Sequence, residues 1–513
     1  MFLGLDSSTQ SLSALILDTD RGVIAHEDSI NFGKDLPSYG SPSGFIPGGA
    51  GGEVHADPMM WVEALDLLLS RLSDDFDLSQ ITAIACSGQQ HGSVYLDETF
   101  GSLLAALDSA SPLVNQIAPA LARPTAPIWM DTSTGTECAE IAETLGGNDE
   151  VCRRSGSVTI ERFTGPQIRK FHKADPSGYE KTAIIHLVSS FMGSILAGKD
   201  IAIDFGDGAG MNLLNLHSLD WDDDLLEATA PGLRAKLPLV GPSATSGGQI
   251  AGYFVEKYGF SEFCEVVLST GDNPSSLVGM GATEPGTFVI SLGTSDTFFA
   301  AMTDPMTDPN GFGHVFGNPA GGFMSLICFR NGSLAREALR DQLGLDWSSF
   351  DAEGLSSTPA GNDGRVMLPF FGPEITPRHD FTGPVRNFPA DAPSEVQVRA
   401  LLEGQFLNMR LHSQWLGEKP ALIRLTGGAS QNNGIAQLIA NIFQAPVERF
   451  AVANGAALGA AIRAAHACGE NLSELTRSFC RPAPNSRLEP DPSLAAVYEA
   501  SMSSFVELLA SRP

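Results

Sequence analysis

Two short turns carry the residue types that hold phosphate groups and metal ions. The first is Asp6-Ser-Ser-Thr-Gln10 and the second is Gly293-Thr-Ser-Asp296, and each lies between two apolar segments that we predict to be strands. A tight hairpin of this kind directs backbone N–H groups and hydroxyls into one concavity, which suits a polyphosphate. Aligning the flanking strands places Asp6 opposite Gly293. We therefore expect a metal-holding carboxylate in the first turn and bare backbone for a phosphate in the second.

A turn of Gly, Ser and Thr usually does no more than reverse the chain, so either turn alone would be weak support. Here one turn opens each half of the chain. The repetition indicates two related domains that face a nucleotide.

A candidate general base follows another apolar strand. In Gly271-Asp272-Asn273-Pro274 the acid lies at the carboxyl end of a predicted strand, where ligands of open α/β sheets bind. Asp272 could accept a proton from a substrate hydroxyl, with Asn273 orienting that substrate. Turns of this composition are common, so an ordinary turn is the alternative interpretation.

Two further segments carry groups that suit a polyol. Ser87-Gly-Gln-Gln-His-Gly92 follows an apolar strand and offers neutral donors and acceptors, although a lone histidine such as His91 is often structural. Arg162, in Glu161-Arg-Phe-Thr-Gly165, could bind substrate hydroxyls or pair with a neighbouring acid.

A glycine-rich turn, Gly427-Gly-Ala-Ser-Gln-Asn432, lies between a predicted strand and a predicted helix. Its glycines would let the backbone lie against a ring or a phosphate at the helix N-terminus, but a tight strand-to-helix turn would need them as well. The sequence contains no GxxxxGK[ST] loop, HRD kinase motif, HExxH or GxSxG. Nucleotide chemistry in this chain must therefore use another architecture.

The elements that position these residues alternate along the chain. Strands alternating with helices in both halves predict an α/β fold, with the boundary between Gly271 and Gly286. The predicted helices are Asp57–Leu72, Thr132–Leu145, Glu180–Leu196, Leu401–Leu416, Gly434–Phe443 and Asn454–His466, and the predicted strands outside the two hairpins are Ile81–Ser87, Val266–Leu268, Ala421–Leu425 and Val447–Phe450.

Composition limits the choice of partners. The chain has 513 residues, which favours two large domains, and a formal net charge of −29. That charge argues against nucleic acid and against an anionic membrane, and it requires local donors or a metal ion to hold any anionic ligand.

Cysteine usage and hydropathy indicate a cytoplasmic protein. The seven cysteines are scattered and form no C-x-x-C pair, so we expect reduced thiols and no zinc site. No signal peptide is evident. The most apolar run, residues 183–197, is shorter than a membrane span and contains His186 and three serines, which favours a buried helix.

Taken in order, these motifs resemble those of the FGGY carbohydrate kinases, and the likeness extends over almost the whole chain. Within that family the chain is most similar to the animal-type kinases of xylulose. The motifs that carry the resemblance are Asp6–Gln10, Ser87–Gly92, Gly271–Pro274, Ser291–Asp296 and Gly427–Asn432, with Trp129–Asp131, Glu161–Gln167, Asp207–Leu214, Phe329–Ser333 and Glu403–Phe406 as further matches.

The resemblance implies two ribonuclease-H-like domains of the actin/hexokinase type with a catalytic cleft between them, one spanning residues 1–277 and the other 278–513. It implies phosphorylation of D-xylulose at the 5-hydroxyl by ATP with Mg²⁺. The implied roles are Asp272 as catalytic base; His91, Arg162, Asp272 and Asn273 as sugar contacts; Asp6 as metal ligand; and Thr9, Gln10, Gly293, Thr294, Ser295, Gly428, Ala429 and Asn432 as nucleotide contacts, with Trp347 near a position that meets ATP.

Several alternatives stay open. The substrate could be another ketose or a polyol, such as ribulose or glycerol, because epimers differ by the direction of one hydroxyl. An actin-type or chaperone-type ATPase would share the duplicated architecture. The expected partners are a small sugar and ATP, without nucleic acid or membrane, and a homodimer is one assembly that the sequence leaves open.

Overall fold

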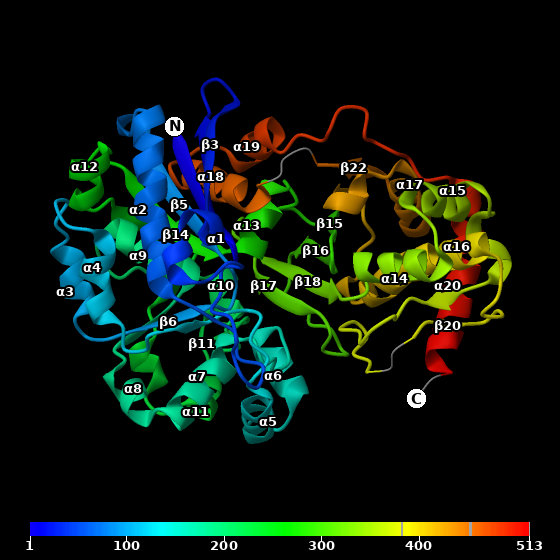
Figure 1. Ribbon diagram of the computed structural model, residues 1–513, viewed down its shortest axis with the longest axis horizontal. Coiled ribbons are helices and arrows are strands. Elements are labelled where there is room, and N and C mark those ends of the chain that lie inside the picture. The colour runs from blue at the N-terminus through cyan, green and yellow to red at the C-terminus, as the bar shows by residue number, and fades with distance from the viewer. Residues whose placement is uncertain (381–382, 451–453, 512–513) are drawn as a thin grey trace.

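The computed structural model describes residues 1–380, 383–450 and 454–511, and its framework is two six-stranded mixed sheets (Figure 1). The sheet of the N-terminal half has the order β13-β14-β5-β1-β2-β3, and the sheet of the C-terminal half has the order β17-β18-β16-β15-β21-β22. The strands of the first sheet are β1 (Phe2–Ser7), β2 (Ser11–Asp18), β3 (Val23–Asn31), β5 (Ala83–Gly88), β13 (Ser246–Gln249) and β14 (Glu265–Gly271). Those of the second are β15 (Thr287–Leu292), β16 (Asp296–Met302), β17 (His314–Gly317), β18 (Phe323–Phe329), β21 (Leu422–Thr426) and β22 (Val447–Arg449).

Both predicted hairpins are present, as β1–β2 and β15–β16, and each is joined to a parallel strand, β5 or β21. The two halves are thus duplicated α/β units, as the sequence predicts.

Strand register corrects the alignment of the two turns. Asp6 pairs with Ser87 of β5 and is the penultimate residue of β1, whereas Ser291 pairs with Thr426 of β21 and is the penultimate residue of β15. Ser291 is therefore the counterpart of Asp6. The prediction that Asp6 faces Gly293 was wrong by two positions, because the apolar run stops at the charged Asp6 while the strand itself continues to Ser7.

Helices cover both faces of the first sheet, because alternate residues of β1 point to opposite sides. Leu3 and Leu5 lie in one core with α2 (Pro58–Asp75) and α9 (Val188–Ala197), while Phe2 lies in the other core, which continues into the C-terminal half. Asp57 caps α2 by accepting a hydrogen bond from the Met59 backbone, and Pro58 occupies the first turn.

The remaining helices surround these sheets. In the N-terminal half they are α1 (Phe32–Asp35), α3 (Phe100–Ala105), α4 (Leu113–Ile117), α5 (Gly135–Thr144), α6 (Asn148–Ser155), α7 (Thr164–Ala174), α8 (Pro176–Lys181), α10 (Phe205–Ala209), α11 (Asp223–Thr229), α12 (Gly252–Tyr258) and α13 (Asp272–Gly279). In the C-terminal half they are α14 (Ser333–Leu343), α15 (Trp347–Ser356), α16 (Ser394–His412), α17 (Asn433–Phe443), α18 (Gly455–Ala467), α19 (Leu472–Phe479) and α20 (Ala495–Ala510).

The predicted helix Glu180–Leu196 was wrong in part. Helix α8 ends at Lys181, and β8 (Ile184–Leu187) pairs antiparallel with β6 (Ser93–Leu96) before α9 begins. Strand partners far away in the sequence decide this segment, which an apolar run alone does not reveal. Helix α9 is buried along its whole length, and among the described residues no helix has the length and apolar character needed to cross a bilayer.

One helix from near the C-terminus packs on the sheet of the N-terminal half. Helix α18 packs on β1, β2 and β5 and crosses α13, the helix that begins with Asp272 (Figure 1). The two helix backbones touch: a Cβ on Gly459 would lie 1.8 Å from the Ser275 carbonyl oxygen, and one on Gly279 would lie 1.9 Å from the Gly455 carbonyl oxygen. Ser275 Oγ also donates to the Ala456 carbonyl oxygen at 2.7 Å. This crossing fixes the helix that presents Asp272.

Candidate active site between the two halves

Asp272 is the first residue of α13, directly after β14. Its Oδ1 accepts from the Asn273 backbone N–H at 2.8 Å and from Asn273 Nδ2 at 3.0 Å, and Nδ2 also donates to Gln90 Oε1 at 2.9 Å. Burial, reinforced by the negative charge of Asp6, raises the pKa of Asp272 to about 7. A carboxylate with a pKa near neutrality is suited to accept a proton from a hydroxyl.

Asp6 lies on β1, close enough to Asp272 for its charge to raise the pKa of that residue. Ser87 Oγ of the adjacent strand donates to Asp6 Oδ1 at 2.7 Å, and burial raises the pKa of Asp6 to about 6. Asp6 and Asp272 thus influence each other as like charges, and no lysine or arginine of the described chain forms an ion pair with either. Two hard oxygen ligands in this state are suited to a divalent cation.

A cavity of about 290 Å³ opens between the halves beside these residues. The N-terminal half contributes mainly polar groups, and the C-terminal half contributes two hydroxyls and an apolar wall. The lining residues are Gln90, His91, Trp129, Arg162, Asp272 and Asn273 from the first half and Ser295, Thr297, Leu326, Cys328 and Ile375 from the second.

His91 is held as a neutral acceptor. Its Nδ1 donates to the Gly210 carbonyl oxygen at 2.7 Å, and its ring stacks on Phe163 with centroids 4.2 Å apart. Burial and the nearby Arg162 lower the pKa of His91 to about 3. Because Nδ1 carries the proton, Nε2 has a free lone pair that can accept a hydrogen bond from a hydroxyl.

Arg162 is oriented from the opposite half of the molecule. Its Nη2 donates to His314 Nε2 at 3.3 Å, and His314 Nδ1 lies 3.2 Å from Ser157 Oγ. Burial holds the pKa of His314 well below its usual value, so the ring is neutral and can accept from the guanidinium. His314 belongs to no motif in the sequence and was not predicted, because only the fold brings β17 beside Arg162.

A second cavity, of about 520 Å³, lies wholly in the C-terminal half. Three predicted nucleotide contacts, Gly428, Ala429 and Asn432, line it together with Trp347, whose side chain is 43% exposed. Gly427 has a φ of 85°, and a Cβ there would lie 2.4 Å from the Leu292 carbonyl oxygen, so the turn requires glycine. The other lining residues are Ser333, Arg336, Phe350, Asp351, Gln431 and Ile435.

The turn Gly293–Ser295 lies between residues of the two cavities, although Gly293 and Thr294 line neither of them. Ser295 lines the first cavity, while the Gly293 carbonyl oxygen accepts from the backbone N–H of Ser333, which lines the second, at 3.0 Å. A chain of phosphates lying along Gly293, Thr294 and Ser295 would therefore extend from one cavity to the other.

The remaining predicted contacts, Thr9 and Gln10, lie in the turn after β1 and line neither cavity. Thr9 is linked to the first cavity through Trp129, whose Nε1 donates to Thr9 Oγ1 at 2.8 Å. Gln10 is exposed, and its backbone oxygen accepts from the Phe32 N–H. Trp129 itself is 44% exposed and lines the cavity, a position that only the fold reveals.

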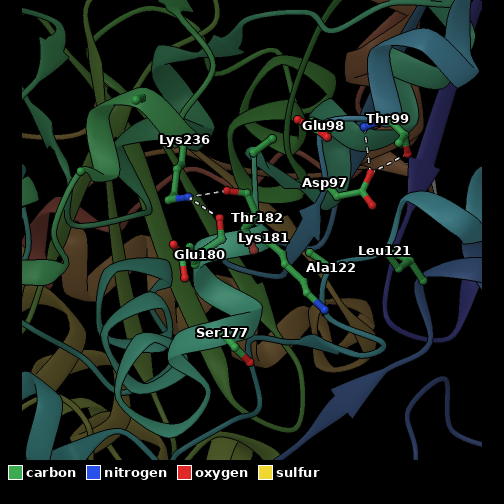
Figure 2. A pocket seen from close by; sticks show the side chains of 13 residues that line it. Asp97, Glu98, Thr99, Leu121, Ala122, Ser177, Glu180, Lys181, Thr182 and Lys236 are labelled. Carbon is green, nitrogen blue, oxygen red and sulfur yellow. Dashed lines mark hydrogen bonds between the residues drawn. The ribbon is translucent and has the colours of Figure 1, made fainter.

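A larger hollow, of about 980 Å³, lies elsewhere on the N-terminal half (Figure 2). There Lys236 donates to the carbonyl oxygens of Glu180 and Thr182, and Asp97 accepts from Thr99. None of its 13 lining residues holds a buried polar atom without a partner, whereas Gln90 Nε2 and the Nε and Nη1 of Arg336 in the two smaller cavities are such atoms. Such atoms can be completed by a water or a ligand, so size alone does not identify the site.

Comparison with known proteins agrees with this geometry. The models of the FGGY family of carbohydrate kinases match residues 1–279 with the N-terminal domain and 288–468 with the C-terminal domain. The chain is 40% identical to the xylulose kinase of Rattus norvegicus, over 99% of this chain and 96% of the rat protein. It is 41% identical to xylulose kinase 2 of Arabidopsis thaliana, over 91% and 87%.

Among solved structures, the xylulose kinase from Rhodospirillum rubrum superimposes with a TM-score of 0.84 at 20% identity, over 99% of this chain and 98% of that one, which shows a shared fold. The resemblance inferred from the motifs is confirmed. The chain belongs to the FGGY family of carbohydrate kinases.

Proposed function

We propose that this carbohydrate kinase transfers the γ-phosphoryl group of ATP to the 5-hydroxyl of D-xylulose. The rat and Arabidopsis relatives are both described as xylulose kinases. The observation that carries the proposal is the cavity between the halves, where Asp272, Asn273 and His91 share one space with Ser295 of the phosphate turn.

In this proposal Asp272 is the general base. Its pKa of about 7 leaves a large ionised fraction at neutral pH and a useful affinity for the proton of the sugar hydroxyl. Asn273 holds Oδ1 through two hydrogen bonds and so sets the direction of the carboxylate. Phosphoryl transfer depends mainly on alignment and charge neutralisation, and a positioned base with a phosphate turn supplies both.

The sugar is held by groups of complementary hydrogen-bonding character. His91 Nε2 accepts from one hydroxyl, and the guanidinium of Arg162 donates to others. Asn273 and Asp272 bind near the reacting hydroxyl. The apolar side chains of Leu326 and Ile375 face the carbon side of the sugar from the opposite half.

The nucleotide occupies the second cavity. Its base lies near Trp347, Gly428 and Ala429, and Asn432 both lines the cavity and caps α17 by accepting from the backbone N–H groups of Gly434 and Ile435. The phosphates lie along Gly293–Ser295, opposite the turn with Thr9 and Gln10. On this basis residues 1–277 form the sugar-binding part and 278–513 the nucleotide-binding part, with α18 returning to support the first sheet.

Asp6 would hold Mg²⁺ together with phosphate oxygens and water. The fit rests on the paired carboxylates of Asp6 and Asp272, which lack a cationic partner in the described chain, and on the preference of Mg²⁺ for a few carboxylates rather than a full protein cage. When bound, the ion neutralises phosphate charge during transfer.

A coupled assay of ADP release over D-xylulose, D-ribulose, L-ribulose and glycerol tests the proposal. We expect the highest kcat/KM with D-xylulose, with the new phosphate at O5 by nuclear magnetic resonance (NMR), and only slow ATP hydrolysis without sugar. A higher kcat/KM for another polyol would reassign the substrate. Equal ATP hydrolysis with and without sugar would contradict the kinase assignment and favour an actin-type or chaperone-type ATPase.

A further inference from the structure

The guanidinium of Arg336 in α14 is buried but only partly used. The side chain is 2% exposed, and its Nη2 donates to both carboxylate oxygens of Asp296, at 2.9 and 3.2 Å. Its Nε and Nη1 have no hydrogen-bond partner among the described residues. Leaving two donors of a buried cation unsatisfied is costly, so the arrangement calls for an acceptor that the chain itself does not supply.

These donors lie at the second cavity. Arg336 and Ser333 both line it and are three residues apart on α14, so they share one face of the helix. The backbone of Ser333 is bonded to Gly293 of the phosphate turn, and Trp347 lies on the cavity wall with them. Arg336 therefore lies between the place proposed for the phosphates and the place proposed for the base. The one acid that lines this cavity, Asp351, accepts from the Asn432 side chain.

The ion pair also connects Arg336 to the turn. Asp296 is the first residue of β16, and its carboxylate accepts from the Gly293 backbone N–H as well as from Arg336. The guanidinium is thus fixed through Nη2 by the same residue that shapes the turn, while Nε and Nη1 have no partner beside the cavity that Arg336 lines. A guanidinium nitrogen held in this way suits a charge-assisted hydrogen bond to a phosphate oxygen.

A purely structural arginine in the same half shows the difference. Arg399 of α16 is also buried and paired with an acid, but every one of its nitrogens has a partner. Its Nε donates to Glu403 at 2.7 Å, its Nη2 to the Tyr498 hydroxyl at 3.0 Å and its Nη1 to the Gly354 carbonyl oxygen at 3.4 Å. Arg336 thus differs from Arg399 in having two donors without a partner among the described residues.

We propose that Arg336 binds the nucleotide, donating through Nε or Nη1 to an oxygen of the α- or β-phosphate. This inference rests on the proposed function, because it takes the second cavity as the nucleotide site. It adds a cationic ligand to a set of contacts that are otherwise backbone, apolar or neutral, in a protein whose net charge of −29 disfavours anions.

The test is the affinity for ADP, AMP and adenosine measured by calorimetry on Arg336→Lys. Lysine keeps a cation beside Asp296 but lacks the separate Nε and Nη1 donors. We expect ADP to bind 10- to 100-fold more weakly and adenosine to change less than twofold. A loss that AMP shares would assign the α-phosphate, and a loss confined to ADP would assign the β-phosphate. Arg399→Lys is the matched control and should leave the ADP-to-adenosine ratio unchanged.

Equal losses for ADP and adenosine, or no loss for ADP, would overturn the assignment of Arg336. If Arg336→Lys does not fold, the double variant Asp296→Asn/Arg336→Gln removes both charges together and should show the same selective loss for ADP. A wild-type protein that binds neither ADP nor adenosine would instead contradict the proposed nucleotide site itself.

Discussion

The turn after β1 and the turn after β15 occupy equivalent places in two similar sheets, but they treat their acidic side chains differently. Burial raises the pKa of both Asp6 and Asp296 to about 6, but their partners differ. Asp6 accepts from a serine hydroxyl and lies near the like charge of Asp272. Asp296 is bound by Arg336 within the fold. The first turn is left needing a cation from outside, whereas the second has its charge neutralised and can receive phosphate.

The difference shows that the two halves share the same sheet framework, while single side chains give the two turns different binding properties. Ser291, the counterpart of Asp6, is neutral, so the second turn adds no negative charge where phosphates would lie. The proposed metal side and the proposed phosphate side are thus distinguished by one carboxylate and one ion pair rather than by the fold.

The largest effect should come from Asp272, which lies outside both turns. We predict that Asp272→Ala lowers kcat by about 10²- to 10⁴-fold, the range that general-base catalysis contributes. ADP affinity should stay within about threefold of wild type, since Asp272 does not line the second cavity. Initial rates and calorimetry measure the two quantities, and near-normal turnover would show that Asp272 is not the base.

Asp6→Asn should have the next largest effect. Removing the charge that faces the metal should lower kcat about 100-fold, comparable to the loss of one strong electrostatic contact in other active sites. The Mg²⁺ concentration for half-maximal rate should rise at fixed ATP. An unchanged Mg²⁺ dependence would exclude Asp6 as the metal ligand.

The same variant should alter the pH dependence. The Asp6 charge helps to raise the pKa of Asp272, so a neutral asparagine in place of Asp6 would let Asp272 ionise at lower pH. The acidic limb of the rate, measured with both substrates below saturation so that it reports the free enzyme, should therefore move to lower pH. A limb that stays in place or moves upward would contradict the coupling.

Trp129→Phe should have a small effect. The variant keeps an aromatic wall in the first cavity but loses the hydrogen bond to Thr9, which is worth about 0.5–1.5 kcal/mol. We expect a rise in the KM for ATP of about 2- to 10-fold with the KM for sugar nearly unchanged. The opposite split, with only the sugar KM affected, would show that Trp129 serves the sugar alone.

The sequence predicted the duplicated hairpins and the motif residues of both cavities, because glycine, proline and polar turns at strand ends leave local signals. It did not predict His314 or Arg336, which resemble ordinary residues of a strand and of an amphipathic helix. Their roles arise from contacts over 152 residues to Arg162 and over 40 residues to Asp296. The strand Ile184–Leu187 was missed for the same reason, since its partner β6 is remote in the sequence.

The contrast between the two turns can be tested by equilibrium unfolding of Asp6→Asn and Asp296→Asn at pH 5 and pH 8. A carboxyl with a raised pKa in the folded protein binds protons more tightly there than in the unfolded chain. Its contribution to stability therefore falls as pH rises from about 4 to about 6. Above about pH 6 the buried charge of Asp6 destabilises the folded protein, and asparagine at this position removes that charge.

At pH 8, without Mg²⁺ and nucleotide, we predict that Asp6→Asn raises the free energy of unfolding by about 1–3 kcal/mol and that the gain shrinks at pH 5. Asp296→Asn should lower it by about 3 kcal/mol, because Arg336 is left as an unpaired buried charge. Opposite signs at pH 8 are the predicted result. A loss of stability in both variants would contradict the account, in which Asp6 has no cationic partner within the fold and Asp296 is neutralised by Arg336.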